Sequence, residues 1–321
     1  MRRVLTTAGL AAALAAGGAS AAPSEPARAG ADLAVQRGGH VEKGVLQGGR
    51  FERVRHLDIP ADHKIGDGLI AYEGVGWESD KVAYRLYLDE RLVTDIFGKR
   101  RPAVVLPTVG RGASYHDMGD WGMDVFHVGP SLGVGGLGVM EGGAVRQVGR
   151  ADHLSADVLV DGPREARVLV TAKGLQAQGR RYDLSARYSI AAGSRLTFVD
   201  ATTSAPAPLA TGLAKAKGAA RLQSTTNAAG EWAWVAEWGR QSLAGPDDQL
   251  GIAVVYRRSE AAQVGEDAAN LFVRFRPELK GVHYAFAAAW DQETGGVRDQ
   301  AGFRRYLDGV VAGLNHGAGA R

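Results

Sequence analysis

The feature that most constrains this chain is the alternation of apolar and polar side chains along many short segments, a pattern typical of β-strands. Residues 82–88 place three aliphatic side chains and Tyr84 on one face of a strand, with Arg85 and Tyr87 on the other. Turn residues at 191–194 and the short gap at 276–281 predict two hairpins. Many strands joined by turns predict a mainly β fold, a large antiparallel β-sandwich. Strand patterns cover residues 82–88, 166–172, 181–190, 195–201, 252–257, 271–275 and 282–290.

The C-terminal segment has helical rather than strand spacing. Asp299 can cap a helix, and apolar residues follow at helical intervals from Phe303 to Leu314. We therefore expect a short C-terminal helix after the last strand.

The N-terminus has the pattern of a secretory signal peptide. Arg2 and Arg3 precede a short apolar run at residues 4–16, and small residues end at Ala21. A membrane-spanning helix needs about 20 apolar residues, which is more than this run supplies. We predict a signal peptide over residues 1–21, a flexible lead-in over 22–48 and a single β-sandwich domain over 49–321. The mature protein would be periplasmic or secreted, with no membrane insertion.

The composition excludes several classes of protein. The chain has no Cys, so disulfides, thiolate metal sites and a Cys nucleophile are ruled out. The formal net charge is +3, two of these charges lie in the predicted signal peptide, and no basic stripe suggests nucleic-acid binding. The glycines at 133–138 lack the strand–helix unit of a dinucleotide site, and we interpret them as a glycine-rich strand or turn. Serine-esterase and zinc-protease motifs are also absent.

Two glycine-spaced segments, residues 62–81 and 114–125, are dense in polar and aromatic side chains. Loops on a rigid sheet often carry functional residues. His63 and His116 lead the acid–base candidates, because imidazole exchanges a proton near neutral pH and each lies near an Asp. A structural hydrogen-bonding role is the alternative for each histidine. The predicted catalytic residues are His63, Glu73, Glu78, Tyr115, His116 and Asp117.

The same segments contain groups suited to a sugar. The faces of Trp77, Trp121 and Trp290 could cover the C–H patches of a sugar ring, although core packing is the alternative for each. Lys81 and Arg85 could bind a uronate carboxylate, although ion pairing with nearby acids is the alternative. The acids of the second segment lack the spacing of a calcium loop, and we predict no metal and no other cofactor. The predicted substrate-binding residues are Trp77, Lys81, Arg85, Asp120, Trp121, Asp124 and Trp290.

Residues 63–68, 72–74, 76–85 and 115–124 resemble a bacterial family of exported proteins labelled a domain of unknown function. The resemblance spans most of the mature chain, and its motifs are long and unusual. It implies an association with enzymes that degrade pectin and other uronate polysaccharides. The family is also similar to the galactose-mutarotase-like β-supersandwich group, which includes sugar epimerases, polysaccharide lyase domains and glycosidase domains. No catalytic assignment can be carried over from the family.

The resemblance implies a carbohydrate-active enzyme whose partner is a uronic-acid-containing oligosaccharide or polysaccharide fragment. A lyase would use His116 or Tyr115 for proton transfer, with Arg85 or Lys81 stabilising the developing charge. A hydrolase would need two carboxyl groups flanking the bond, and an epimerase-type reaction would pair a His with a carboxylate.

A non-catalytic glycan-binding module and an accessory structural protein are the alternative functions. An enzyme should bring a His, an acid and a base together in a deep pocket. A binding module should instead show a shallow aromatic groove, and a scaffold should show salt-bridged groups without a pocket.

Overall fold

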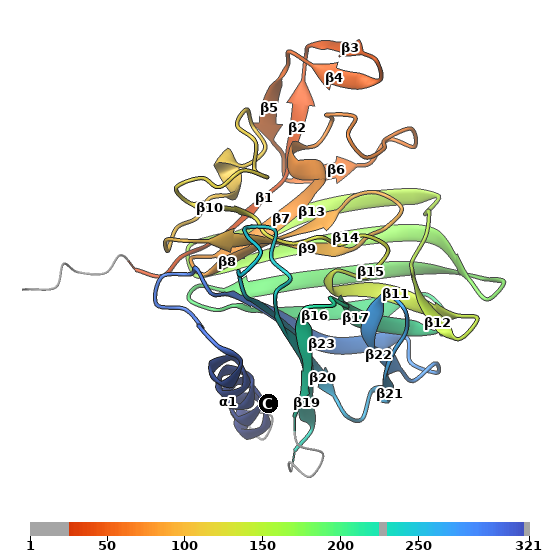
Figure 1. Cartoon of the computed structure of the whole chain (residues 1–321). Helices are drawn as coiled ribbons and strands as arrows, with labels where there is room; N and C mark the ends of the chain where they lie inside the picture. Colours follow the sequence, from red (N-terminus) through yellow and green to blue (C-terminus); the bar gives the residue numbers. More distant parts are fainter. Residues whose placement is uncertain (1–25, 225–229, 318–321) are drawn as a thin grey trace, which may run out of the picture.

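The computed structural model describes residues 26–224 and 230–317 (Figure 1), so the predicted signal peptide lies outside the described residues. As the alternation predicted, the described chain is mainly β, with large antiparallel sheets and a single C-terminal helix, α1 (Gln300–Gly317). Asp299 Oδ1 accepts a hydrogen bond of 2.6 Å from the backbone N–H of Gly302, which confirms the predicted cap. Within the described ranges, no helix has both the length and the apolar character needed to cross a membrane.

Three large sheets form the body of the fold, and two small hairpins project from it (Figure 1). We call them the central sheet, in the order β18-β19-β20-β23-β16-β15-β14-β13-β6, the N-terminal sheet, β1-β7-β8-β9-β10, and the side sheet, β12-β11-β17-β22-β21. The central sheet contains β6 (His56–Asp58), β13 (His153–Asp161), β14 (Glu165–Ala177), β15 (Arg180–Ala191), β16 (Leu196–Thr203), β18 (Ala219–Gln223), β19 (Trp232–Gly239), β20 (Leu250–Arg257) and β23 (Gly281–Trp290). The N-terminal sheet contains β1 (Ala29–Asp32), β7 (Gly74–Ser79), β8 (Val82–Tyr87), β9 (Thr94–Lys99) and β10 (Gly122–Asp124). The side sheet contains β11 (Val134–Glu141), β12 (Ala144–Gln147), β17 (Leu209–Ala214), β21 (Ala261–Glu266) and β22 (Asn270–Phe275). The hairpins pair β2 (Ala34–Arg37) with β5 (Arg50–Arg53), and β3 (His40–Glu42) with β4 (Val45–Gln47).

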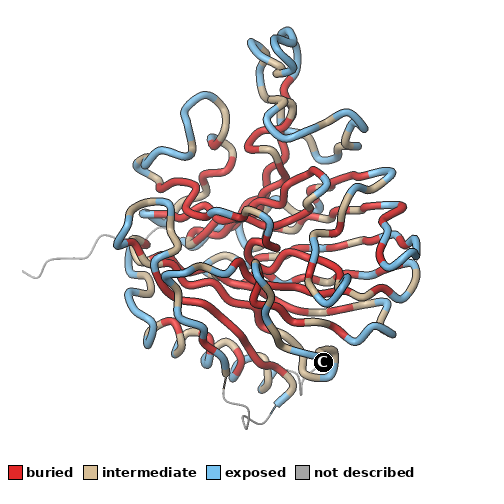
Figure 2. The backbone as a smooth tube through the Cα atoms, turned by 45° about the vertical axis from the view of Figure 1, so that its right-hand side comes forward, coloured by how far each residue is buried: buried red, intermediate tan, exposed pale blue. Residues whose placement is uncertain are grey.

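The main core lies between the central sheet and the two five-stranded sheets, all of which contribute apolar side chains to one cluster. Trp77 of the N-terminal sheet stacks on Tyr188 of the central sheet, with ring centroids 4.8 Å apart. Helix α1 packs against β19 and β20 through a second apolar cluster, in which Phe303 lies 5.5 Å from Trp238. The buried strands therefore run through the middle of the molecule, with exposed turns around them (Figure 2).

The order of strands tests the two predicted hairpins. Strands β15 and β16 pair directly, which confirms the hairpin around residues 191–194. The hairpin at 276–281 is wrong, because β22 pairs in the side sheet whereas β23 pairs in the central sheet. The connection between β22 and β23 therefore crosses from one sheet to another. The sequence patterns of two adjacent strands do not show which sheet each strand joins.

The predicted flexible lead-in, residues 22–48, instead contains four strands from residue 29 onward. Strand β1 is buried and pairs with β7, and Leu33 is fully buried directly after it. At Gly30 the absence of a side chain allows close packing, because a Cβ added there would lie 3.1 Å from the Val104 side chain. Ordered structure therefore begins well before residue 49.

Candidate functional site

The two faces of the N-terminal sheet differ in chemistry. One face packs on the central sheet through Val75, Trp77 and Ile96. We call the opposite side the outer face. It carries Arg85 and Asp95, and loop residues with the helical turn η2 (Leu106–Thr108) cover it with a third apolar cluster. Both segments predicted to carry function thus meet at this sheet.

Arg85 is the centre of the outer face. It lies directly opposite Asp95 in the β8–β9 register, and its Nε and Nη2 donate to Asp95 Oδ2 at 3.0 and 2.6 Å. Nη2 also donates to Asp124 Oδ2 at 2.8 Å and to the hydroxyl of Tyr87. Arg85 and both carboxylates are at most 2% exposed, so these charge-assisted bonds compensate the desolvation of all three groups.

This arrangement corrects the predicted role of Arg85. We expected its guanidinium to bind a substrate carboxylate, but it is buried and its donors are occupied by protein groups. Arg85 instead holds neighbouring groups of the protein. Its Nη1 donates to the backbone oxygen of Tyr72 at 3.2 Å and to the Tyr115 hydroxyl at 3.4 Å.

Asp124 is a buried acid with an altered protonation equilibrium. Burial, assisted by the nearby negative charge of Asp95, raises the pKa of Asp124 to about 7, against the lowering effect of Arg85. Its carboxyl group is therefore poised between its two protonation states near neutral pH.

His116 connects this buried acid to the surface. Its Nδ1 lies 3.5 Å from Asp124 Oδ2, while its side chain is 62% exposed. The ring of Tyr115 lies 4.3 Å from the His116 ring and is half-buried against Phe97. Burial raises the pKa of Tyr115, which keeps its phenol protonated. The structure thus brings three predicted residues, Tyr115, His116 and Asp124, together over Arg85.

A strained turn presents Glu73 near the same group. Tyr72 and Glu73 have φ of 41° and 60°, a left-handed conformation that side chains other than glycine rarely adopt. Arg85 binds the Tyr72 carbonyl, and Glu73 Oε1 accepts a hydrogen bond of 2.7 Å from the backbone N–H of Gly66. Such local strain is concentrated at functional sites and persists only where surrounding contacts enforce it.

Glu78 is structural rather than catalytic. Its side chain and that of Lys99 are fully buried and form an ion pair. Glu78 Oε1 accepts from the backbone N–H groups of Val105 and Leu106 at 3.0 and 2.8 Å, which fastens the covering segment to the sheet. No surface of Glu78 remains for a substrate, so the predicted catalytic role is wrong.

Two of the three predicted aromatic platforms are also wrong. Trp77 is fully buried and donates from Nε1 to Thr197 Oγ1 at 2.9 Å. Trp290 is 3% exposed and donates to Asp248. Trp121 is half-buried beside Phe97, at 6.2 Å, and keeps part of its ring accessible.

The remaining predicted residues lie around this group or away from it. Lys81 is at the β7–β8 turn, 3.7 Å from Asp80 and at the opposite end of β8 from Tyr87. Asp117 and Asp120 are exposed on the covering loop. His63 contacts Asp67 at 2.7 Å and lines a separate pocket.

Sequence reasoning missed Asp95 and underrated Tyr87. Tyr87 Oη donates to Asp95 Oδ2 at 2.9 Å, so both belong to the buried network. The available signal was an acid inside the short apolar stretch 93–97, which pairs across a turn with the strand containing Arg85. In the described part of the chain, no three His, Asp or Glu side chains converge as metal ligands would. The outer face instead offers an exposed imidazole 3.5 Å from a buried acid, and both types of group can exchange protons.

Comparison with known proteins gives one family. The model of the family described as "Domain of unknown function (DUF4861)" matches residues 9–318, nearly the whole chain. No curated protein matches the chain.

Proposed function

We propose that this chain, which belongs to the DUF4861 family, is an exported enzyme that acts on uronic-acid-containing oligosaccharides. The observation that carries the proposal is the placement of His116, largely exposed, 3.5 Å from the buried carboxyl group of Asp124. A proton donor or acceptor must reach the substrate, and an imidazole at the surface does so.

The roles of the residues follow from their burial. His116 is the catalytic residue that exchanges a proton with the sugar. Asp124 orients its ring, as a carboxylate does in other His–Asp pairs. Arg85 holds Asp124, Tyr115 and the backbone of Tyr72 in place.

The substrate class is supported by sequence resemblance and by the chemistry of the accessible groups. The motif stretches resemble exported proteins that occur with uronate-polysaccharide-degrading enzymes, and a mutarotase-like supersandwich is a fold used by sugar-active proteins. Half-buried Tyr115 and Trp121 beside His116 and Glu73 supply ring faces and polar groups for a sugar. Burial of Trp77 and Trp290 leaves Trp121 as the accessible member of the three predicted aromatic platforms.

The experiment is to incubate the purified mature protein with a panel of saturated and unsaturated uronate oligosaccharides. Absorbance reports new double bonds, reducing-sugar assays report hydrolysis, and NMR reports epimerisation. We expect one of these activities, and we expect His116→Ala to lower kcat by about 10²–10⁴-fold, the usual contribution of general acid–base catalysis. Because His116 is 62% exposed, the free energy of unfolding should change by no more than about 0.5 kcal/mol.

His127→Ala is the matched control, since His127 is also exposed and follows β10 closely in sequence. It should keep wild-type activity. Equal activity of His116→Ala and wild type would contradict the assignment of His116. Binding of uronides without any turnover would replace the enzyme by a glycan-binding module.

Export is part of the same proposal. We infer a periplasmic or secreted protein from the sequence of residues 1–21, with cleavage near Ala21. The intact mass of protein recovered outside the cytoplasm tests this, and a mass that still includes residues 1–21 would refute it.

A further inference from the structure

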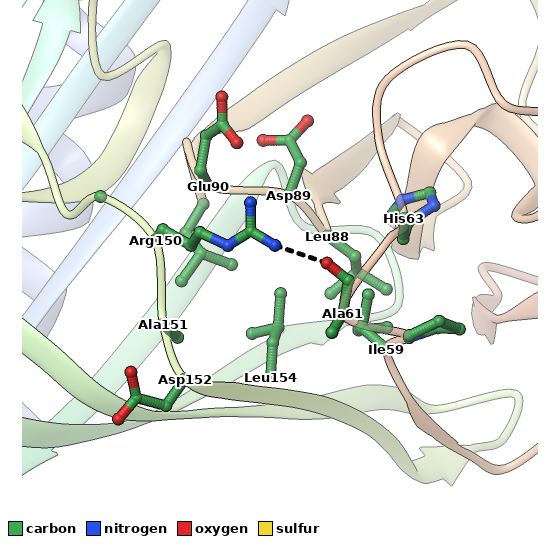
Figure 3. Close-up of a pocket in the computed structure, with 13 residues that line it drawn as sticks. Ile59, Ala61, His63, Leu88, Asp89, Glu90, Arg150, Ala151, Asp152 and Leu154 are labelled. Carbon is green, nitrogen blue, oxygen red and sulfur yellow. Dashed lines mark hydrogen bonds between the residues drawn. The ribbon is translucent and has the colours of Figure 1, made fainter.

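A polar cavity lies next to the N-terminal sheet, and His116 is not among the residues that line it. Its volume is about 310 Å³, at the lower end of the range for small-molecule sites. Three segments form it: residues 59–63, the β8–β9 turn and residues 149–154 (Figure 3). His63 is the one predicted site residue among those that line it.

The cavity carries charges of both signs, and Asp152, on the same segment as Arg150, is ion-paired with Arg181. Figure 3 shows the carboxylates of Asp89 and Glu90 on one wall, with the guanidinium of Arg150 across from them. Arg150 donates to the backbone oxygen of Ala61, and no described carboxylate lies within ion-pair distance of it. A guanidinium has five N–H donors, so most of those on Arg150 remain for a ligand.

His63 supplies an imidazole beside these charges. Its side chain is 3% exposed, and Asp67 Oδ2 holds its Nδ1 at 2.7 Å. Asp67 is itself fixed by backbone N–H groups of Lys64 and Leu69, at 3.1 and 2.9 Å. No described residue hydrogen-bonds to Nε2 of His63. This nitrogen keeps solvent-accessible surface, so it can hydrogen-bond to a polar ligand or to water.

Apolar side chains complete the lining. Ile59, Leu88 and Leu154 lie between the polar groups (Figure 3). They offer a surface for the C–H face of a small ring. Asp89 is ion-paired with Arg91, so Glu90 is the acid across from Arg150 that disfavours a dianion such as a phosphate ester by like-charge repulsion. Glu90 can accept hydrogen bonds from hydroxyl groups instead.

We propose that this cavity binds one uronic acid residue of a sugar chain, with its carboxylate on Arg150 and its hydroxyl groups on His63 and Glu90. The choice of sugar rests on the proposed function, whereas the chemistry of the ligand, a hydroxylated carboxylate, rests on the cavity alone.

The cavity is connected to the outer face through β8. Asp89 binds Arg91, with Oδ2 2.6 Å from Nη2, and the Arg91 guanidinium lies 3.9 Å from the centroid of the Tyr87 ring. Tyr87 belongs to the Arg85 network. Contacts therefore run from the cavity to the Arg85 network through Asp89, Arg91 and Tyr87.

The test measures binding of D-galacturonate and D-galactose to the mature protein by NMR titration. The two sugars differ only in the carboxylate. We expect galacturonate to bind at least tenfold more tightly, and Arg150→Met to remove that preference, because charge-assisted hydrogen bonds carry it. Arg146→Met is the matched control: Arg146 is an arginine of β12 with a 65% exposed side chain outside the cavity lining, and its variant should bind like wild type.

Equal binding of the two sugars, no binding of galacturonate, or equal affinities of Arg150→Met and Arg146→Met would each overturn the cavity proposal. His116→Ala separates the two proposals, since it should lose turnover and keep galacturonate binding. Turnover that depends on His116 without galacturonate binding leaves only the enzyme proposal standing. Binding that depends on Arg150 without turnover leaves only the cavity proposal standing.

Discussion

The two faces of the N-terminal sheet are both buried, yet they are built from opposite chemistry. The inner face presents Trp77 and Ile96 to the central sheet, and contact with apolar neighbours is enough to stabilise it. The outer face buries Glu78, Arg85 and Lys99, each at most 2% exposed. Buried charges are compatible with a stable fold only while each has its partner. Apolar residues of similar volume often give equal stability in their place. A chain that keeps them therefore carries a feature that stability alone does not require.

The difference also separates two parts of the outer face. The Glu78–Lys99 ion pair has no exposed surface, and it joins the covering segment to the sheet. The Arg85 network reaches the surface through Asp124 and His116. The first part should respond to mutation through stability, and the second through activity and pH.

The largest expected effect on stability comes from removing the cation of the buried Glu78–Lys99 ion pair. Lys99→Met leaves the Glu78 carboxylate buried without a cation, and the lost Nζ also donates to the Ala103 carbonyl at 2.7 Å. We expect the free energy of unfolding to fall by about 3–5 kcal/mol, measured by urea denaturation.

The double variant Glu78→Gln with Lys99→Met provides the control. It removes both charges, and we expect it to regain at least half of the loss. A single-variant cost below about 1 kcal/mol, the value for exposed pairs, would mean that the two faces do not differ as described.

The next effect concerns the pH dependence of stability. The pKa of Asp124 is raised to about 7 in the folded protein from a value near 4 when unfolded. Between these values the folded state holds a proton that the unfolded state has released. The stability contributed by this group is present at low pH and is lost as pH rises toward 7. From pH 5 to 7 we expect wild type to lose about 2 kcal/mol relative to Asp124→Asn, which has no such proton.

The measurement is urea denaturation of both proteins at several pH values. Met123→Leu is the control, because Met123 is the neighbouring residue on β10 and faces the core. Its stability difference from wild type should stay below about 1.5 kcal/mol and not vary with pH. If the free energies of unfolding of wild type and Asp124→Asn changed equally with pH, the predicted effect of Asp124 titration on stability would be wrong. Asp124→Asn should also lower kcat more than it changes KM, since Asp124 acts through His116.

The contrast between the faces explains what the sequence could predict. Period-two alternation predicts that Arg85 and Tyr84 point to opposite faces of the sheet, and the structure confirms this. The two dense segments were predicted to carry function, and the structure brings Tyr115, His116 and Asp124 of the second over Arg85 of β8, whereas His63 of the first lines a separate pocket. Burial of the second face was beyond this reasoning. A strand with one polar face is typical of a half-exposed sheet. Arg85 was therefore predicted to bind substrate and Glu78 to be catalytic.

The missing information was long-range. The cover over Glu78 is the backbone around Val105, and the partner of Arg85 is Asp95 on a strand that we did not predict. Trp77 and Trp290 were misassigned for the same reason, since an aromatic residue beside polar neighbours fits either a core or a sugar platform. Only the sheet order, which pairs β1 with β7 and separates β22 from β23, distinguishes these cases.

The smallest expected effect is on the inner face. Ile96 follows Asp95 on β9 but points to the core, where it is 1% exposed. Ile96→Val removes one methylene group, and we expect a loss of about 0.5–1.5 kcal/mol in the free energy of unfolding. Because no charge is involved, the loss should be the same at pH 5 and pH 8, and kcat should equal that of wild type. Asp95→Asn, one residue away on the other face, should instead reduce kcat, since Asp95 holds Arg85 and the Tyr87 hydroxyl. If Ile96→Val lowered kcat as much as Asp95→Asn, the separation of a structural inner face from a functional outer face would be wrong.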